Sequence, residues 1–430
     1  MSEKETSQQT TGEKSVSVNF FDVETNNCPY HAYKDLRDDA PVWKDPRTGM
    51  YVISRYDDVR TVVIDVERFS NAKKPVRINT PEMIERQQKI GNLYKEKGWV
   101  PAPTLAGRDD PNHKEMRALF DHAFRPSRIK LLDPMVERVS QQLINAFIDK
   151  GECDWVQAFA VPLPLIVIGF QMGAPEEDIW KIKAWTDAWV QRLGMMQTEE
   201  EALWSTEMEI EAQHYFQPIF DKLRKEPNDT LLSDIVNTVI PEWGRALSDE
   251  ELHAEMMADT FVGGSETSTN ALSGGIMLLA KNPKAWDQLR SNPDKYVPVL
   301  VEEAIRLEGP VQGLFRVTTV DVEMHGVTIP AGSTVNVRFA AANRDDRHFE
   351  NPDELDLDRA NTRSHVGFGA GVHFCLGAPL ARRELAIGFR AFVDNIADFA
   401  LVDPDMHMDY QRNFALRALT SLPITFEAKR

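Results

Sequence analysis

The chain has 430 residues, of which 42% are hydrophobic and 27% charged, a composition typical of a soluble globular protein. Its 49 basic and 67 acidic residues give a formal net charge of −18, which disfavours nucleic acid and anionic membranes as partners. No apolar run approaches the roughly 20 residues of a membrane helix. We therefore expect no nucleic-acid partner, no membrane association and a cytoplasmic location.

The predicted elements begin after a polar N-terminal tail. Residues 1–17 are rich in Ser, Thr, Gln and Glu and lack an apolar signal core, so we expect a disordered tail followed by one domain over residues 18–430. A first group of elements is then predicted, with helices at Tyr30–Arg37 and Tyr56–Ile64 and a hairpin formed by Val42–Trp43 and Met50–Ile53.

The stretch from Phe69 to Asp110 is harder to interpret. It holds a charged helical segment, Pro81–Lys97, and a proline-containing stretch that ends at Pro103. Long loops in compact domains are often functional lids or disordered pieces. Surface decoration without a function explains the same residues, and both interpretations stay open.

From residue 112 the pattern is mostly helical, and Asp or Ser stands near several helix starts. Helices are expected at Asn112–Ala123, Arg125–Lys150, Val161–Met172, Pro175–Leu193, Glu199–Arg224, Thr230–Val239, Ser248–Lys281, Pro283–Asn292, Tyr296–Leu307 and Pro379 to about Ile396. Val and Thr alternate between Leu314 and Phe339, which predicts a compact antiparallel sheet. The expected fold class is mainly α with small peripheral antiparallel sheets.

The predicted helix Ser248–Lys281 breaks a local rule at its centre. Gly263, Gly264, Glu266 and Thr267 interrupt it, although glycine and hydroxyl residues disfavour helix interiors. Adjacent glycines permit a bulge or a kink, and such a violation often marks a functional position. A glycine-rich helix crossing with Glu266 in a surface salt bridge is the alternative.

A second unusual stretch, residues 367–377, places glycines around Cys375 just before a helix. Glycine lets the backbone approach a flat ligand closely, and a helix N-terminus favours thiolate over thiol. These features suit a metal ligand, whereas the alternative is a structural cysteine in a turn. Cys28 and Cys153 lie far away and give no disulfide framework or zinc spacing.

The pattern Phe-Gly-x-Gly-x-His-x-Cys-x-Gly over residues 368–377 resembles the haem-binding loop of the cytochrome P450 family. The resemblance implies the P450 fold, a helical bundle shaped like a triangular prism that encloses haem b (iron protoporphyrin IX). It implies that the Cys375 thiolate binds the iron. Phe368, Gly369, His373 and Gly377 would contact the cofactor.

The interrupted helix is similar to the oxygen-binding groove of the same family. By this match Gly263 and Gly264 open the groove, and Gly264 contacts the cofactor. Thr267 would hydrogen-bond the bound dioxygen, and Glu266 would gate proton delivery to it, so these two residues are the catalytic candidates.

Three further charged residues match a structural motif of the family. Glu303 and Arg306 form a Glu-x-x-Arg signature, whose spacing puts both side chains on one helix face. The resemblance implies that Arg359 joins them in a buried cluster that holds the cysteine loop, whereas the pair alone would suggest a surface ion pair.

Cationic residues also match the groups that hold the haem propionates. His113 and Arg117 stand one helical turn apart, and Arg316 and His373 match two further donors. His365 is a weaker candidate. Any one of them alone would more often be a surface residue, so their order along the chain carries the prediction.

The resemblance implies a monooxygenase that inserts one atom of O2 into an apolar small molecule of terpenoid, steroid or aromatic type. The candidate pocket residues are Val262, Gly263, Val311, Leu314, Phe315 and Phe414. The alternatives are a haem-thiolate peroxygenase, a non-oxidative haem enzyme, and a haem-based ligand-binding protein. The Glu266–Thr267 pair argues against all three, and the sequence does not choose the substrate.

The sequence contains no flavin, nicotinamide or iron–sulfur signature, so electrons must come from a separate protein. The resemblance suggests a ferredoxin that docks on the proximal face of a monomeric enzyme. A basic patch could attract it, formed by Arg125, Arg128, Lys130, Arg382 and Arg383. Ordinary solvated helix charges explain these residues equally well.

Overall fold

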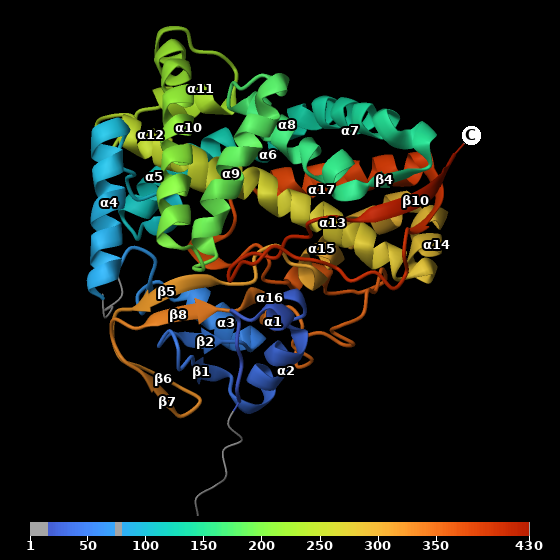
Figure 1. Cartoon of the computed structure of the whole chain (residues 1–430), viewed down its shortest axis with the longest axis horizontal. Coiled ribbons are helices and arrows are strands. Elements are labelled where there is room, and N and C mark those ends of the chain that lie inside the picture. Colours follow the sequence, from blue (N-terminus) through green and yellow to red (C-terminus); the bar gives the residue numbers. More distant parts are fainter. Residues whose placement is uncertain (1–15, 74–79, 430) are drawn as a thin grey trace, which may run out of the picture.

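The computed structural model describes residues 16–73 and 80–429, and helices form the larger part of it (Figure 1). The expected disordered tail therefore lies almost wholly outside the described residues, and its boundary at residue 17 stays a prediction. No helix within residues 16–73 and 80–429 has both the length and the apolar character needed to cross a bilayer.

The α-helices are α1 Val23–Asn27, α2 Tyr30–Asp39, α3 Tyr56–Ile64, α4 Pro81–Lys97, α5 Asn112–Ala123, α6 Pro126–Ile129, α7 Asp133–Phe147, α8 Pro162–Gln171, α9 Ile179–Leu193, α10 Glu199–Lys225, α11 Leu231–Asn237, α12 Asp249–Glu255, α13 Thr267–Ala280, α14 Pro283–Ser291, α15 Pro293–Leu307, α16 Phe339–Ala342 and α17 Ala378–Asn395. The 3₁₀ turns are η1 Leu105–Gly107, η2 Lys130–Leu132, η3 Ile148–Lys150, η5 Glu176–Asp178, η7 Thr362–Ser364 and η8 Gly371–His373. Two segments are π-helical, η4 Val156–Ala160 and η6 Met256–Glu266.

Most predicted helices are present, but the one expected over Arg125–Lys150 is broken into α6, η2, α7 and η3. Pro126 and Pro134 account for the breaks, because proline has no N–H for the helical ladder and is tolerated only in a first turn. Each of these two prolines stands in the first turn of a new helix.

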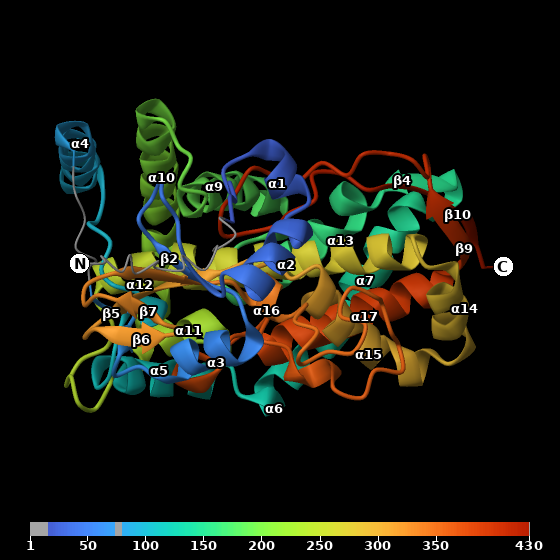
Figure 2. The same cartoon turned by 90° about the horizontal axis from the view of Figure 1, so that it is seen from below.

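The central element is the continuous run of α12, η6 and α13. Figure 2 shows α13 between a layer that contains α9 and α10 and a layer that contains α15 and α17. Nearly every residue of α13 is buried, which fits a helix that carries no charged side chain. The interrupted helix predicted from the sequence therefore runs through the middle of the helical layers.

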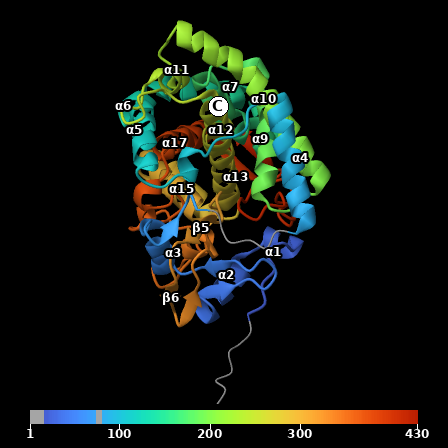
Figure 3. The same cartoon turned by 90° about the vertical axis from the view of Figure 1, so that its left-hand side faces the viewer.

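Helix α4 stands at one edge, beside α9 and α10 (Figure 3). Tyr94 is its one buried side chain, and polar contacts tie it to α10. Lys89 pairs with Glu199 at 2.8 Å, and the Tyr94 hydroxyl donates to Glu209 at 2.7 Å. The segment that the sequence left open thus folds back onto the helical layer.

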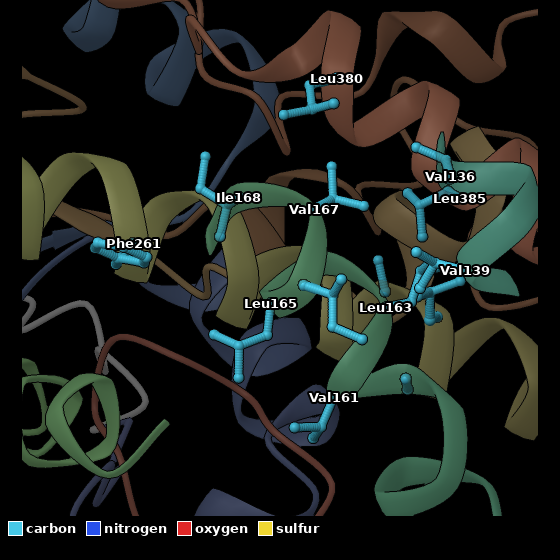
Figure 4. Packing of buried hydrophobic residues seen from close by; sticks show 14 of the residues in the cluster. Val136, Val139, Val161, Leu163, Leu165, Val167, Ile168, Phe261, Leu380 and Leu385 are labelled. Atoms are coloured by element: carbon cyan, nitrogen blue, oxygen red, sulfur yellow. The ribbon is translucent and has the colours of Figure 1, made fainter. Parts of the chain in front are cut away.

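The main hydrophobic core packs against the central helix (Figure 4). Ile168 of α8 and Phe261 of η6 belong to it, together with Val136 of α7 and Leu385 of α17, all of which are almost fully buried. Burying side chains of this size contributes about 1.5–3 kcal/mol each. This core fixes the position of the central helix relative to α17.

The strands are β1 Val42–Lys44, β2 Tyr51–Ile53, β3 Phe69–Ser70, β4 Glu152–Asp154, β5 Leu314–Thr318, β6 Val322–Met324, β7 Val327–Ile329, β8 Thr334–Val337, β9 Ile396–Leu401 and β10 Pro423–Ala428. They form a five-stranded sheet of order β1-β2-β8-β5-β3, a three-stranded sheet of order β4-β10-β9 and the pair β6-β7. The sheets are small and antiparallel as expected, with one exception. Strands β2 and β8 pair in parallel, because they come from distant segments whose direction no hairpin turn dictates.

Candidate active site

The predicted oxygen-binding groove coincides with the first residue of α13 and the π-helical segment η6. Its wider helical turns leave backbone groups free, and the Thr267 hydroxyl donates to the Gly263 carbonyl at 2.6 Å. A β-carbon at Gly263 would meet open space, whereas one at Gly264 would lie 3.1 Å from Ile168. Gly263 therefore faces the open side, and Gly264 lets the helix approach α8 closely.

Glu266 is buried and does not form the surface salt bridge of the alternative interpretation. Its Oε1 lies 3.1 Å from Nζ of Lys183 and accepts a hydrogen bond from the Thr186 hydroxyl at 3.0 Å. Lys183 also contacts Asp187. Burial lowers the pKa of Lys183, but Glu266 and Asp187 outweigh it and leave this pKa raised, so the ammonium keeps its proton at neutral pH.

The cysteine loop has the tight geometry that its glycines predict. Gly369 and Gly371 adopt φ of +70° and +69°, which L side chains rarely tolerate, and the Cys375 N–H donates to the Phe368 carbonyl at 2.9 Å. Burial raises the pKa of the Cys375 thiol, because it disfavours the charged thiolate. The backbone N–H groups of Gly377 and of the residue after it bond the sulfur and act in the opposite direction.

Four cationic or donor residues converge beside this loop. The rings of His113 and His373 lie 4.1 Å apart between centroids, and Arg117 donates to the Phe374 carbonyl at 2.8 Å. Burial lowers the pKa of His373 to about 4, with His113 and Arg316 adding to the effect. Burial likewise lowers the pKa of Arg316 to about 10.

Several of these donors have no acceptor. Among the residues that the structure describes, neither ring nitrogen of His113 nor Nε of Arg316 has a hydrogen-bond partner, although both side chains are buried. Asp110 lies 3.4 Å from Nδ1 of His113 without forming a hydrogen bond. Buried donors are rarely left unsatisfied, so the cluster fits a ligand that brings carboxylates, as haem does.

Helix α15 holds the start of the cysteine loop. Arg306 and Glu303 form two hydrogen bonds of 2.6 and 2.9 Å with both side chains fully buried, and Nε of Arg359 lies 3.2 Å from Glu303. Next to them Glu302 bonds His365 at 3.0 Å. Burial raises the pKa of Glu302, but the hydrogen bonds from His365 and Arg382 outweigh it and hold this pKa at about 2.

Comparison with known proteins decides what this arrangement belongs to. A family model described as Cytochrome P450 matches residues 195–401. The chain is 32% identical to a steroid C26-monooxygenase of Mycobacterium tuberculosis (strain ATCC 25618 / H37Rv), over 92% of this chain and 93% of the relative. The chain belongs to the cytochrome P450 family.

Two further P450s give the same result. The chain is 32% identical to the polyketide biosynthesis cytochrome P450 PksS of Bacillus subtilis (strain 168), over 94% of this chain and 96% of the relative. Its fold is similar to the solved structure of cytochrome P450 CREJ in complex with (4-ethylphenyl) dihydrogen phosphate, with a TM-score of 0.85, 30% identity, and 93% and 98% of the two chains covered. This P450 is thus a haem-thiolate monooxygenase that uses O2, a redox partner and a small-molecule substrate.

The predicted pocket residues of this P450 separate into two groups. Val262 and Val311 pack together with Val190 and Leu416, which are not among the six predicted pocket residues. Leu314 is also partly exposed, with 37% of its surface accessible.

Phe315 and Phe414 instead stack on each other, with ring centroids 5.8 Å apart, in a different core cluster beside the N-terminal segment. The reason is the alternation of side chains along a strand: Phe315 points away from the face that carries Leu314 and Arg316. Phe315 and Phe414 thus lie in a different cluster from Val262 and Val311, whereas Leu416 packs with those two valines; the pocket assignment of the two phenylalanines stays a prediction.

The loop before α5 is bonded to the distal helix of this P450. Glu255 accepts a hydrogen bond from the Leu105 N–H at 2.5 Å, and Asp259 accepts one from the Ala106 N–H at 3.1 Å. Leu105 is buried in the main core. The stretch 69–110 therefore contributes a wall next to η6. No sequence signal pointed to these two carboxylates, because the contacts join residues about 150 positions apart.

The basic patch predicted for the proximal face is largely neutralised. Arg128 pairs with Asp234, Arg382 with Glu302 and Arg383 with Asp133. Arg125 and Lys130 have no carboxylate within 4.0 Å among the described residues. Apolar side chains are exposed nearby in the chain, Leu131 at 76%, Val372 at 44% and Phe374 at 39%.

Glu384 of α17 is a fully buried carboxyl group next to α13. Its Oε2 accepts a hydrogen bond from the Ser268 hydroxyl at 2.9 Å, and its Oε1 has no partner among the described residues. Burial raises the pKa of Glu384 to about 8, and the bond from Ser268 lowers it only in part. The side chain is therefore a neutral acid at pH 7.

The buried Glu384 predicts a specific dependence of stability on pH. Its folded pKa of about 8 lies above its ordinary value of 4.5, so its contribution to stability is complete below pH 4.5 and is lost as the pH rises to 8. The loss amounts to at most about 5 kcal/mol. The free energy of unfolding of the haem-loaded Glu384→Gln variant, measured with denaturant, should therefore not show this decline with rising pH.

The matched control is Ser268→Ala, which removes the hydrogen bond but keeps the carboxyl group. It should retain the loss of stability with rising pH. Equal pH dependence in Glu384→Gln and the unaltered protein would show that the side chain ionises freely in the fold.

Proposed function

We propose that Cys375 holds the iron of haem b in this P450, and that the enzyme oxidises a neutral apolar molecule of terpenoid, steroid or aromatic type. The observation that carries the proposal is the set of unsatisfied buried donors, above all His113 and Arg316, beside the Cys375 loop. His113, Arg117, Arg316 and His373 would hold the two propionates. The cofactor, when bound, supplies the activation of dioxygen and the oxidation of the substrate.

The protein's own contribution would be a controlled proton supply. The Thr267 hydroxyl, fixed by the Gly263 carbonyl, is held at the open side of η6. Behind it Glu266 accepts from Lys183, whose ammonium stays protonated at neutral pH. Burial keeps bulk water away from Glu266 and raises the pKa of its carboxyl group, while Lys183 and Thr186 hold its Oε1 in place. Glu266 would therefore pass a proton towards Oγ1 of Thr267 as this hydroxyl gives its own proton to the site.

The pocket residues support an uncharged substrate. Val190, Val262, Val311 and Leu416 are aliphatic, and the cations near them, such as Lys183, are paired. Arg192 likewise contacts Glu209. No described cation near this cluster is left to bind a substrate carboxylate. A relative named as a steroid C26-monooxygenase supports the same apolar class.

For the electron donor we propose a ferredoxin that docks on the face of the cysteine loop. Three of the five predicted basic residues are paired, so Arg125 and Lys130 would carry the electrostatic part, and the exposed Phe374 and Val372 the apolar part. The monomeric state and the cytoplasmic location stay predictions.

The role of Cys375 is tested by the spectrum of the ferrous protein with carbon monoxide. A haem that is ligated by thiolate gives a red-shifted Soret band, so Cys375→Ala should abolish this band, whereas Cys28→Ala, at an exposed cysteine, should keep it. A Cys375→Ala variant that retains the band would refute the assignment. Activity with peroxide but none with O2 and a reductase would favour a peroxygenase.

The role of Thr267 is tested by the coupling of reductant use to product. Thr267→Ala should keep consuming reductant but form about tenfold less product per reductant, with peroxide released instead, because the hydroxyl no longer holds a proton at the site. Thr269→Ala alters a buried threonine on another face of the same helix and should stay coupled. Unchanged coupling in Thr267→Ala would remove this residue from proton delivery.

The docking proposal predicts which charges matter. Arg125→Glu and Lys130→Glu should each raise the ferredoxin concentration for half-maximal reduction several-fold at low salt. Lys284→Glu reverses an exposed charge on α14 and is the control. Equal effects at all three positions would indicate a response to net charge alone and would contradict docking at this face.

A further inference from the structure

Arg338 is a buried cation outside the active site. Only 1% of its surface is accessible, and its guanidinium carbon lies 4.2 Å from the ring centroids of both Phe20 and Phe414. Nη1 donates to the Phe414 carbonyl at 2.8 Å, whereas Nε has no hydrogen-bond partner among the described residues. The side chain is thus held between two phenyl faces with part of its donor capacity unused.

Arg338 shares with Arg37 and Arg316 the lack of a carboxylate within 4.0 Å among the described residues, but no acid raises its pKa, whereas Asp109 raises that of Arg316. The buried arginines with a carboxylate within 4.0 Å are Arg306, Arg344, Arg359 and Arg417. Arg37 has none that close but is acted on by Asp345. Over residues 16–73 and 80–429, no carboxylate lies within 4.0 Å of Arg338. Burial lowers its pKa, and the phenol of Tyr33 is the group that acts against this.

Arg338 lines a small cavity between the N-terminal segment and the loop 413–417. Its volume is about 10 Å³, room for one water-sized occupant. The other polar residues around it include Asn26, Tyr33, Gln312 and Arg417. The two aromatic rings offset part of the cost of burying the guanidinium but carry no net negative charge.

We propose that this cavity binds one halide ion as the counter-ion of Arg338. A monatomic anion is the smallest counter-ion that a cavity of this size could take, whereas a carboxylate or a phosphate is larger still. Arg417 adds positive charge, and its own partner Glu308 is shared with Arg344. The competing occupant is a water molecule, which could also donate to Oδ1 of Asn26, a buried acceptor without a partner among the described residues.

The position of the cavity gives the ion a consequence for the active site. Phe414, which covers Arg338, belongs to the loop whose Leu416 packs against Val262 in the pocket. The same loop is tied to helix α9 by Asn413, which donates to the Val190 carbonyl at 2.9 Å. An ion at Arg338 would therefore stabilise one wall of the substrate pocket from behind.

Crystals of the haem-loaded full chain grown in bromide give the direct test. An anomalous peak in the cavity beside Arg338 is expected. Density without an anomalous signal would mean that water fills the cavity and would overturn the proposal. The haem spectrum, recorded in the same buffer, separates this site from any binding at the iron.

Thermal unfolding in solution gives the second test. With gluconate replaced by bromide at constant ionic strength, the midpoint should rise by about 1.5 °C for each tenfold increase in bromide above half-saturation. Arg338→Met should lose this dependence. Arg37→Met removes another buried arginine, one that donates to the carbonyl of Ala341, and should keep it.

A midpoint independent of bromide, even with a peak in the crystal, would mean binding at crystal concentration only and would also overturn the proposal. Should Arg338→Met not fold, the bromide series on the unaltered protein and on Arg37→Met still decides.

Discussion

The geometry of the active site depends on one buried ion cluster at helix α15. Glu303 binds Arg306 and Arg359, and Arg306 also donates to the carbonyls of Asn343 and Pro352. Desolvation makes such a cluster a poor source of net stability, but removing one partner leaves an uncompensated charge and costs about 3–5 kcal/mol. Its effect is therefore to exclude other conformations of the loop that leads to the cysteine.

From this anchor the constraint reaches the cysteine through short contacts. Asn343 accepts a hydrogen bond from the Val366 N–H at 2.8 Å, and a β-carbon at Gly367 would lie 2.6 Å from Ile305 of α15. Any larger residue at position 367 would therefore collide with Ile305. On the other side, Ser268 and Glu384 join the distal helix to α17. The two faces of the site are held by different polar contacts, which lets η6 adopt its loosened π-helical form without moving the cysteine.

The sequence predicted the parts of the site whose signals are local. The glycines around Cys375, the interruption at Gly263–Thr267 and the i, i+3 pair of Glu303 all follow from short spacings. The structure shows the tight loop, the π-helical segment and the buried ion pair, and their assembly around one cofactor stays a prediction. It could not predict Lys183, because an amphipathic helix with a lysine gives no sign of which buried acid it will meet. Leu416 was missed since its position depends on a bridge to Val311, a contact over about a hundred residues.

Charge balance locates ligands that packing does not reveal. Among the described residues, Arg316 and Arg338 are each buried without a carboxylate within 4.0 Å and with an unpartnered Nε. Arg37 shares these features, but Asp345 acts on it from further away. A fold that pairs Arg306, Arg344 and Arg417 with acids does not leave such cations unpaired at random. At Arg316 the proposed haem propionates would account for the imbalance. The same physical reasoning, applied where no cofactor reaches, assigns a small anion to Arg338.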